Sequence, residues 1–347
     1  MKKGMNTLKT LLLMTLLGTS VFTTSAWGQD FSLTTGTTGV GFDIAWPVND
    51  VFSLRAGYAI MSHINHTMHF GVEVGEDPAS SKSKFDRLSG LLEGFTGYKV
   101  DDVVDMVGEP TYWNWNLMVD VKPFRNKHWH FSAGIYYGNS QVAKAVNSMA
   151  DMPSLMAVGI YNNLYNKAIN NEPYATVNET NLFLPSALED KLRDYGKMSI
   201  HIGDYSHDIY YEEDVVATEE MFIGDELVEP GYVLHHAGDV LYAKGDAYRM
   251  VPDENSMVRA TAYANRWKPY LGFGYGGRLI KGEDRWQVSF DCGAMFWGGT
   301  PKIVTHDGTD LVNDVENIRG KVGDYVDIIK QFKVFPVLNL RISYRLF

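Results

Sequence analysis

Large apolar residues alternate with small or polar residues along many segments of this chain. This period of two constrains the fold more than any other feature. In residues 39–46, every second residue is large and apolar, namely Val40, Phe42, Ile44 and Trp46. The same alternation recurs in residues 51–60, 112–121, 129–138, 271–276, 286–296 and 338–346. Because successive side chains of a β-strand point to opposite faces, the pattern predicts strands with two unlike faces.

The character of the two faces indicates which solvent each one meets. One face is rich in Gly, Ser and Ala and carries isolated charges, which suit a narrow interior. We expect these charged side chains in a lumen: Asp43, Arg55, Asp120, Asp291, Arg341 and Arg345. The other face is large and apolar, with Trp and Tyr near the strand ends, as in the aromatic girdles of membrane barrels. A soluble β-sandwich, with a polar outer face, is the alternative.

Connection lengths favour the barrel. The connections at 47–50, 123–128 and 280–284 are short, whereas 62–111, 139–265 and 298–334 are long. Short turns on one side and long loops on the other are typical of outer-membrane barrels. With a fainter strand at 31–35 the count reaches eight, and strands inside the longest insertion would raise it to at most twelve. The sequence therefore predicts an all-β, antiparallel, up-and-down transmembrane barrel with large, partly helical extracellular loops.

The first 28 residues have the layout of a secretory signal peptide. Lysines at positions 2, 3 and 9 precede an apolar run at 11–22 that is too short to span a bilayer, and small residues follow it. We therefore expect residues 1–28 to be removed and 29–347 to form the barrel. Cys292 is the only cysteine in the chain, so no disulfide can form within it.

Four stretches resemble uncharacterised bacterial outer-membrane β-barrel proteins, including those of Bacteroidetes. They are VDVKPFRNKHWHFSAGIYYG, KPYLGFGYGG, SFDCGAMFWGG and FPVLNLRISYRLF. The last ends on Phe347, like the C-terminal signal of such barrels, although Phe347 is one step out of phase with Tyr344 and Leu346. The resemblance implies a Gram-negative outer membrane, contact with its lipid and lipopolysaccharide, and insertion by the barrel-assembly machinery through the last strand. It implies no catalytic residue.

The long connections are acidic. Residues 139–265 contain 20 Asp and Glu against 8 Lys and Arg, and residues 62–111 contain 9 against 4. This sign disfavours nucleic acid as a partner. A hydrated, mutually repelling surface is the simpler interpretation, and a divalent-cation site is the alternative. The candidate ligands for such a site are Asp204, Asp208, Glu212, Glu213 and Asp214. Helical spacing also predicts helices within 86–95, 141–169 and 186–196, the last with Ser186 as its cap.

Motifs for chemistry are lacking in the sequence. It contains no G-x-S-x-G nucleophile motif, and the glycine run at 272–277 lacks the Lys-Ser/Thr pair of a phosphate loop. His63, His66 and His69 alternate like a strand, which places His66 opposite the other two. We therefore predict a non-enzymatic barrel without metal or cofactor, filled by its own side chains and displaying acidic loops for a structural or surface-binding role. A narrow porin for small solutes, gated by the loops, is the alternative.

Overall fold

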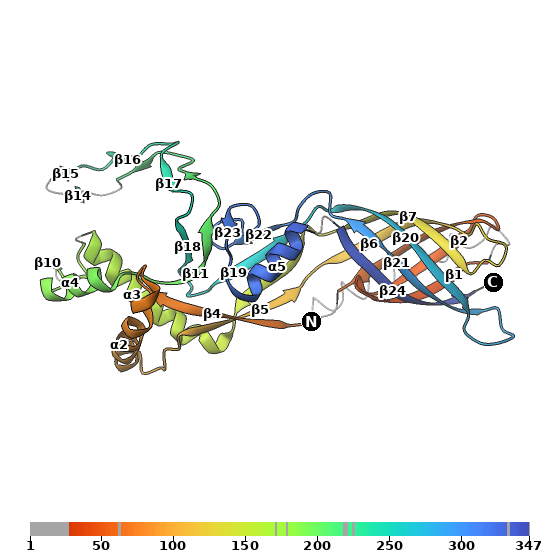
Figure 1. Cartoon of the computed structure of the whole chain (residues 1–347), viewed down its shortest axis with the longest axis horizontal. Coiled ribbons are helices and arrows are strands. Elements are labelled where there is room, and N and C mark those ends of the chain that lie inside the picture. Colours follow the sequence, from red (N-terminus) through yellow and green to blue (C-terminus); the bar gives the residue numbers. More distant parts are fainter. Residues whose placement is uncertain are drawn as a thin grey trace.

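The molecule is elongated, with a closed barrel at one end and a module of sheet and helices at the other (Figure 1). The computed structural model describes residues 28–61, 64–170, 172–177, 180–217, 221–223, 226–331 and 334–346. The expected signal peptide, apart from Gly28, lies outside the described residues, as do His63 and Phe347.

Eight antiparallel strands close the barrel in the order β1-β2-β3-β6-β7-β20-β21-β24, and β1 pairs with β24 from Asp30↔Arg345 to Gly36↔Asn339. The predicted fold class and strand number are thus confirmed. The bounds are β1 Asp30–Gly36, β2 Gly39–Pro47, β3 Phe52–Ile60, β6 Trp113–Val121, β7 Trp129–Gly138, β20 Trp267–Arg278, β21 Trp286–Phe296 and β24 Val334–Arg345. Closure leaves no unpaired strand edge in the barrel.

The barrel walls have the two unlike faces that the alternation predicts. On β1, Leu33 is 61% exposed while Ser32 is 1% exposed, and on β2 the buried Asp43 follows the outward Phe42. Aromatic side chains cluster on the outer surface near both ends of the barrel. Tyr58 packs on Trp115 at one end, with ring centroids 4.8 Å apart, and Trp286 packs on Tyr344 at the other, at 4.9 Å.

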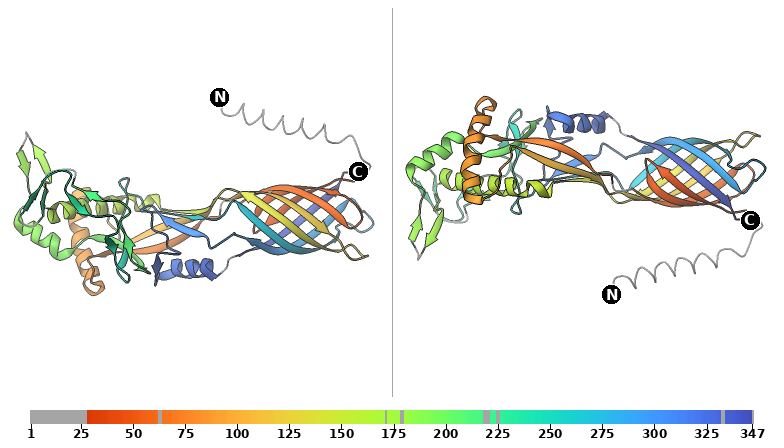
Figure 2. Two further views of the ribbon diagram at one scale, coloured as in Figure 1. Left: turned by 90° about the horizontal axis from the view of Figure 1, so that it is seen from above. Right: turned by 90° about the horizontal axis from the view of Figure 1, so that it is seen from below.

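The two ends of the barrel differ in their connections. Short turns follow β2, β6 and β20 at one end, which we call the turn end. At the opposite, module end, four neighbouring strands continue into a second sheet. The continuing strands β4 His66–Val74, β5 Val103–Pro110, β8 Gln141–Asn147 and β19 Arg259–Tyr263 follow or precede β3, β6, β7 and β20 along the chain. One wall of the barrel is thereby extended beyond its rim (Figure 2).

The sheet module is formed by segments that the sequence assigns to the three long loops. Its strands run in the order β18-β11-β4-β5-β8-β19-β22, and β23 pairs with β11. The remaining bounds are β11 Met198–Tyr205, β18 Ala247–Met250, β22 Lys302–Thr305 and β23 Val315–Glu316. β11 and β18 pair with each other inside the longest insertion, and the pairing of β11 with β4 and with β23 joins segments of the three long loops into one folded unit.

Helices cover this sheet and complete an apolar core. They are α2 Pro78–Thr96, α3 Met152–Ile169, α4 Ser186–Tyr195 and α5 Gly320–Gln331, with a short 3₁₀ turn η1 Met149–Asp151 before α3. The core includes Val74, Val104, Leu155, Met198 and Val315, each fully buried. No helix among the described residues is long and apolar enough to cross a membrane.

The predicted helices differ from the structure in three details. Residues 141–147 form β8, because their backbone pairs with β5 and β19, and the helix begins only at Met152. Ser186 lies inside α4 and its side chain caps nothing; the capping position is Pro185. At α2 the helix starts eight residues before the predicted stretch, after Asp77, whose side chain accepts a hydrogen bond from Ala79 N.

A ribbon of short strand pairs extends away from the sheet module between β11 and β18 (Figure 1). It consists of β12 Ile209–Tyr210 with β17 Val240–Tyr242, β13 Val215–Val216 with β16 Val233–His235, and β14 Met221–Ile223 with β15 Glu226–Val228. A further pair, β9 Ala175–Val177 and β10 Thr180–Leu182, lies between α3 and α4.

Candidate functional site in the barrel lumen

Arg55 on β3 lies at the centre of a charged network inside the barrel. Its Nε and Nη2 donate to the two carboxylate oxygens of Asp120 on β6, each at 3.0 Å. Its Nη1 lies 3.5 Å from Asp43 Oδ2 on β2. Period-two alternation on three neighbouring strands points these side chains inward, and all three are buried. The two-pronged contact with Asp120 fixes the guanidinium plane as well as its charge.

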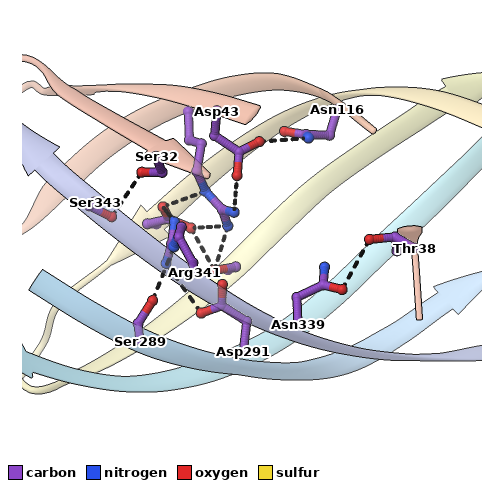
Figure 3. Close-up of polar contacts among 12 residues, drawn as sticks. Ser32, Thr38, Asp43, Asn116, Ser289, Asp291, Asn339, Arg341 and Ser343 are labelled. Carbon is purple, nitrogen blue, oxygen red and sulfur yellow. Dashed lines mark hydrogen bonds and ion pairs between the residues drawn. The ribbon is translucent and has the colours of Figure 1, made fainter. Parts of the chain in front are cut away.

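Arg341 on β24 joins the network from the opposite wall (Figure 3). Its Nη2 donates to Asp291 Oδ1 at 3.1 Å, and its Nε donates to Ser289 Oγ at 3.0 Å. Its Nη1 also lies 3.8 Å from Asp120 Oδ2, so the two arginines share one carboxylate. The network therefore ties strands on both sides of the lumen and crosses it.

Uncharged and titratable partners complete the network. His130 Nε2 lies 2.8 Å from Asp291 Oδ1 and 3.1 Å from Arg341 Nη2. Ser132 Oγ donates to Asp120 Oδ1 at 2.5 Å. Asn116 Nδ2 donates to Asp43 Oδ1 at 2.9 Å. Because every charged member has more than one partner, the desolvation of these groups is offset by several short contacts.

The structure brings together five of the six charged side chains that the sequence assigns to the lumen: Asp43, Arg55, Asp120, Asp291 and Arg341. The sixth, Arg345, lies nearer the turn end, where its Nε is 3.3 Å from Asp30 Oδ1. His130 and Ser132 are missing from the sequence-based set. Their inward phase on 129–138 is visible in the alternation, but a His and a Ser carry no fixed charge that would single them out.

An apolar layer lies between this network and the module end. It consists of Met118, Tyr136, Tyr270, Met295 and Val337, with Phe335 packed against it. The five buried side chains come from five different strands of the barrel, and each is at most 5% exposed. Above the layer, the Tyr112 hydroxyl donates to Thr37 O at 2.6 Å, and the Tyr112 ring packs edge-on against Phe335. The apolar layer thus closes the lumen between the charged network and the module end.

A polar cavity of about 1000 Å³ occupies the other half of the lumen and opens at the turn end. The network forms part of its wall, through Asp120, His130 and Arg341. The rest of the lining includes Lys122, Ser343 and residues of the short turns. The cavity therefore leads inward from the turn end and ends where the charged network begins.

The acidic residues considered as cation ligands are separated from one another, with Asp204 on β11 and the other four in the ribbon. Asp208 Oδ1 accepts from Lys244 N at 2.7 Å, Asp214 Oδ1 accepts from Ala237 N at 2.7 Å, and Asp204 Oδ2 accepts from Asn317 Nδ2 at 2.9 Å. Glu212 and Glu213 are exposed. Among the residues that the structure describes, no group of three or more His, Cys, Asp or Glu side chains is placed to hold a metal ion.

A polar cluster in the sheet module has shifted pKa values. The Tyr248 hydroxyl is 2.9 Å from Asp307 Oδ2 and 2.9 Å from Thr305 Oγ1, and the Thr305 hydroxyl donates to Asp307 Oδ1 at 2.6 Å. Burial raises the pKa of Tyr248 far above its usual range. Burial alone would raise the pKa of Asp307 too, but hydrogen bonds from Thr305, Thr309 N and Tyr248 stabilise the carboxylate and leave its pKa below the usual value of 3.8.

Comparisons with known proteins identify no family. No protein-family model matches the chain, and no curated protein sequence matches it. Among solved structures, CarO2 of Acinetobacter baumannii is 13% identical with a TM-score of 0.35, covering 92% of this chain and 100% of that one. CarO of the same organism is 14% identical with a TM-score of 0.33, covering 92% and 96%. A major outer membrane protein of Thermus thermophilus is 10% identical with a TM-score of 0.25, covering 93% and 100%. Similarity at this level identifies no function.

Proposed function

We propose that the chain is a non-enzymatic outer-membrane β-barrel of a Gram-negative bacterium whose closed lumen makes it an anchor. In this role the barrel holds the sheet module at the cell surface, where the module has a structural or surface-binding function. The observation that carries the proposal is the closure of the lumen by two consecutive layers, the charged network and the apolar layer. An eight-stranded barrel has an interior narrow enough for layers of its own side chains to close it.

The outer surface of the barrel supports the membrane location. Large apolar side chains cover the outward positions of the barrel strands, including Leu33, Leu117, Leu271, Phe290 and Leu340, each more than 40% exposed. A contiguous apolar surface of this extent marks a membrane or an interface. Closure of the sheet also satisfies the condition that lipid sets for backbone groups. Membership in a Bacteroidetes-type family, and insertion by the barrel-assembly machinery through β24, belong to this proposal.

The sheet module supports the surface role. Because short turns face the periplasm in outer-membrane barrels, the module end lies outside the cell. The module has its own apolar core, and helices α2, α3, α4 and α5 cover its sheet. Because four strands of this sheet follow or precede barrel strands along the chain, the barrel wall fixes the position of the module. Its acidic segments, net −12 in residues 139–265, keep its outer surface hydrated.

A narrow pore is the second candidate, and the cavity at the turn end is the observation that favours it. The cavity already connects half of the lumen to solvent at the turn end. A continuous path would require both the charged network and the apolar layer to rearrange. The closed lumen and the narrow pore therefore differ in one measurable property, which is ionic conductance.

Conductance in planar bilayers tests the proposal. We expect purified, refolded protein to produce no stepwise current in concentrated potassium chloride, because two layers of side chains block the path. Flotation of the same preparation with lipid vesicles provides the control that the protein has inserted. Resolved, repeated current steps from inserted wild-type protein would overturn the closed-lumen proposal and favour the narrow pore.

A further inference from the structure

Two buried donor groups lie in the lumen on the module side of the charged network. Lys268 on β20 and Asn114 on β6 are both completely buried. Lys268 Nζ donates to Asn114 Oδ1 at 3.3 Å, across the intervening strand β7. Gly138 on β7 makes this contact possible, because a Cβ there would lie 2.7 Å from Asn114 Oδ1 and 2.0 Å from a backbone oxygen of the neighbouring strand.

The hydrogen-bonding capacity of this pair is unbalanced. An ammonium group has three N–H donors, and a carboxamide has two. Only one bond joins the pair, and Asn114 Nδ2 has no hydrogen-bond partner among the residues that the structure describes. Among the described residues on the inward face of β6, Asn116 Oδ1 is the only buried side-chain oxygen acceptor that has no hydrogen-bond partner. Donors therefore exceed acceptors around Lys268.

The charge of Lys268 is unbalanced as well. Within the described ranges, no carboxylate lies within 4.0 Å of Lys268 Nζ, whereas Arg55 and Arg341 deeper in the lumen each contact two carboxylates. The Tyr112 side chain covers Lys268 and Asn114 on the side of the module end. Its hydroxyl donates to Thr37 O, and its ring packs against Phe335. A buried ammonium group without a counter-ion is strongly unfavourable, so an anion beside it would lower the free energy of the folded state.

We propose that this part of the lumen binds one small inorganic anion of the halide class, held by Lys268 Nζ and Asn114 Nδ2. The anion supplies the acceptor that Asn114 Nδ2 lacks, and it supplies a second acceptor and a negative charge for Lys268 Nζ. Because Met118, Tyr136 and Lys268 itself are all at most 5% exposed, the site is enclosed, which favours a small anion over a large one. The anion site is independent of the proposed anchoring function. The same anion would balance Lys268 in a permanently closed barrel and in the closed state of a pore.

Bromide provides a direct test, because it scatters anomalously and replaces chloride. We expect crystals of the full mature chain grown in sodium bromide to show an anomalous peak within hydrogen-bonding reach of Lys268 Nζ and Asn114 Nδ2. An ordered water at that position without an anomalous peak would overturn the proposal, because a neutral amine bridged by water to Asn116 would then explain the same donors.

Thermal unfolding gives an independent readout in solution. At equal ionic strength, wild-type protein should unfold roughly 2 to 4 °C higher in sodium chloride than in sodium gluconate, whose anion is too large for the site. Asn114→Asp places a carboxylate beside Lys268, so this variant should fold, lose the dependence on chloride and lose the bromide peak. Lys268→Met should also lose the dependence.

Lys122→Met is the matched control, because Lys122 lies at the other half of the lumen, in the lining of the open cavity. This variant should keep both the chloride dependence and the bromide peak. Equal unfolding temperatures of the wild-type protein in chloride and gluconate would contradict the proposal, as would a chloride effect that persists unchanged in Asn114→Asp.

Discussion

The barrel and the sheet module are both built from antiparallel strands, yet their interiors are opposites. The barrel encloses arginine and aspartate side chains and exposes Leu33 and Leu340 on its outer surface. The module encloses Leu155, Met198 and other apolar side chains and exposes acidic residues. The same antiparallel pairing thus occurs in a region whose outer surface suits lipid and in a region whose outer surface suits water. The side-chain pattern determines which solvent each outer surface suits.

This difference also separates the forces that stabilise the two regions. In the module, burial of apolar surface from water is the main favourable contribution. In the barrel the outward apolar side chains gain little from folding within lipid, so interstrand hydrogen bonds and the paired charges of the lumen carry more of the specificity. Substitutions that are equivalent in chemistry should therefore differ in effect between the two regions.

Removal of one charge from the lumen should have the largest effect. Arg55→Met leaves Asp43 without a cation and leaves Asp120 with only the 3.8 Å contact to Arg341, both in a buried site, and we expect a loss of about 3–5 kcal/mol in the free energy of unfolding. Urea unfolding of the protein in detergent micelles measures this. Lys127→Met is the control, because the pair of Lys127 with Asp50 is exposed and contributes less than about 1 kcal/mol. Equal losses in the two variants would contradict the account of the network.

Truncation of the module core should have the next largest effect, and it should leave the barrel intact. Leu155→Ala creates a cavity at a fully buried position of α3, which costs about 2–5 kcal/mol. Limited proteolysis should then cut the module while a fragment containing the barrel stays folded. Met156→Ala, at a neighbouring position that is 51% exposed, should leave the protease resistance unchanged. Simultaneous loss of the barrel would mean that the two regions unfold as one.

A charge on the outer surface distinguishes the solvents of the two regions. Leu340 on the barrel and Leu188 on the module are each 43% exposed. Leu340→Arg should destabilise the barrel by about 2–4 kcal/mol in lipid, because arginine is unfavourable near the middle of a bilayer. Leu188→Arg should change stability by less than about 0.5 kcal/mol, because position 188 faces water. Urea unfolding in lipid vesicles compares the two, and equal tolerance of arginine would place Leu340 in water.

A fall in pH should destabilise the module by protonating its carboxylates. This should be the smallest of the four predicted effects on stability. The folded-state pKa of Asp307 is below 3.8, so its contribution is complete well above that pH and is lost as the pH falls through the lowered value. The pKa values of Asp102 and Asp253 are lowered too. Because Asp307 is exposed and water screens its charge, Asp307→Asn should cost only about 0.5–1 kcal/mol at pH 7 and reduce the slope of module stability between pH 5 and pH 3. A slope identical to that of the wild-type protein would contradict this role of Asp307.

The sequence predicts the barrel better than the module for a physical reason. Each barrel strand has a lipid face and a lumen face along its whole length, so alternation in 39–46 or 338–346 determines both the strand and its inward residues. This is why Asp43 and Arg341 are placed by pattern alone. In the module, residues 141–147 have helical spacing, but strands from distant loops pair with them and override that local preference. The partners of Arg345 and His130 depend on the register of closure, which alternation leaves open.

Extraction of the processed chain from cells tests the central claim, which is that the apolar outer surface of the barrel faces lipid. We expect the protein to remain in the membrane fraction after alkaline carbonate treatment, which removes peripheral proteins, and to be released only by detergent. A processed chain that is recovered instead as a stable monomer in aqueous buffer without detergent would contradict the claim.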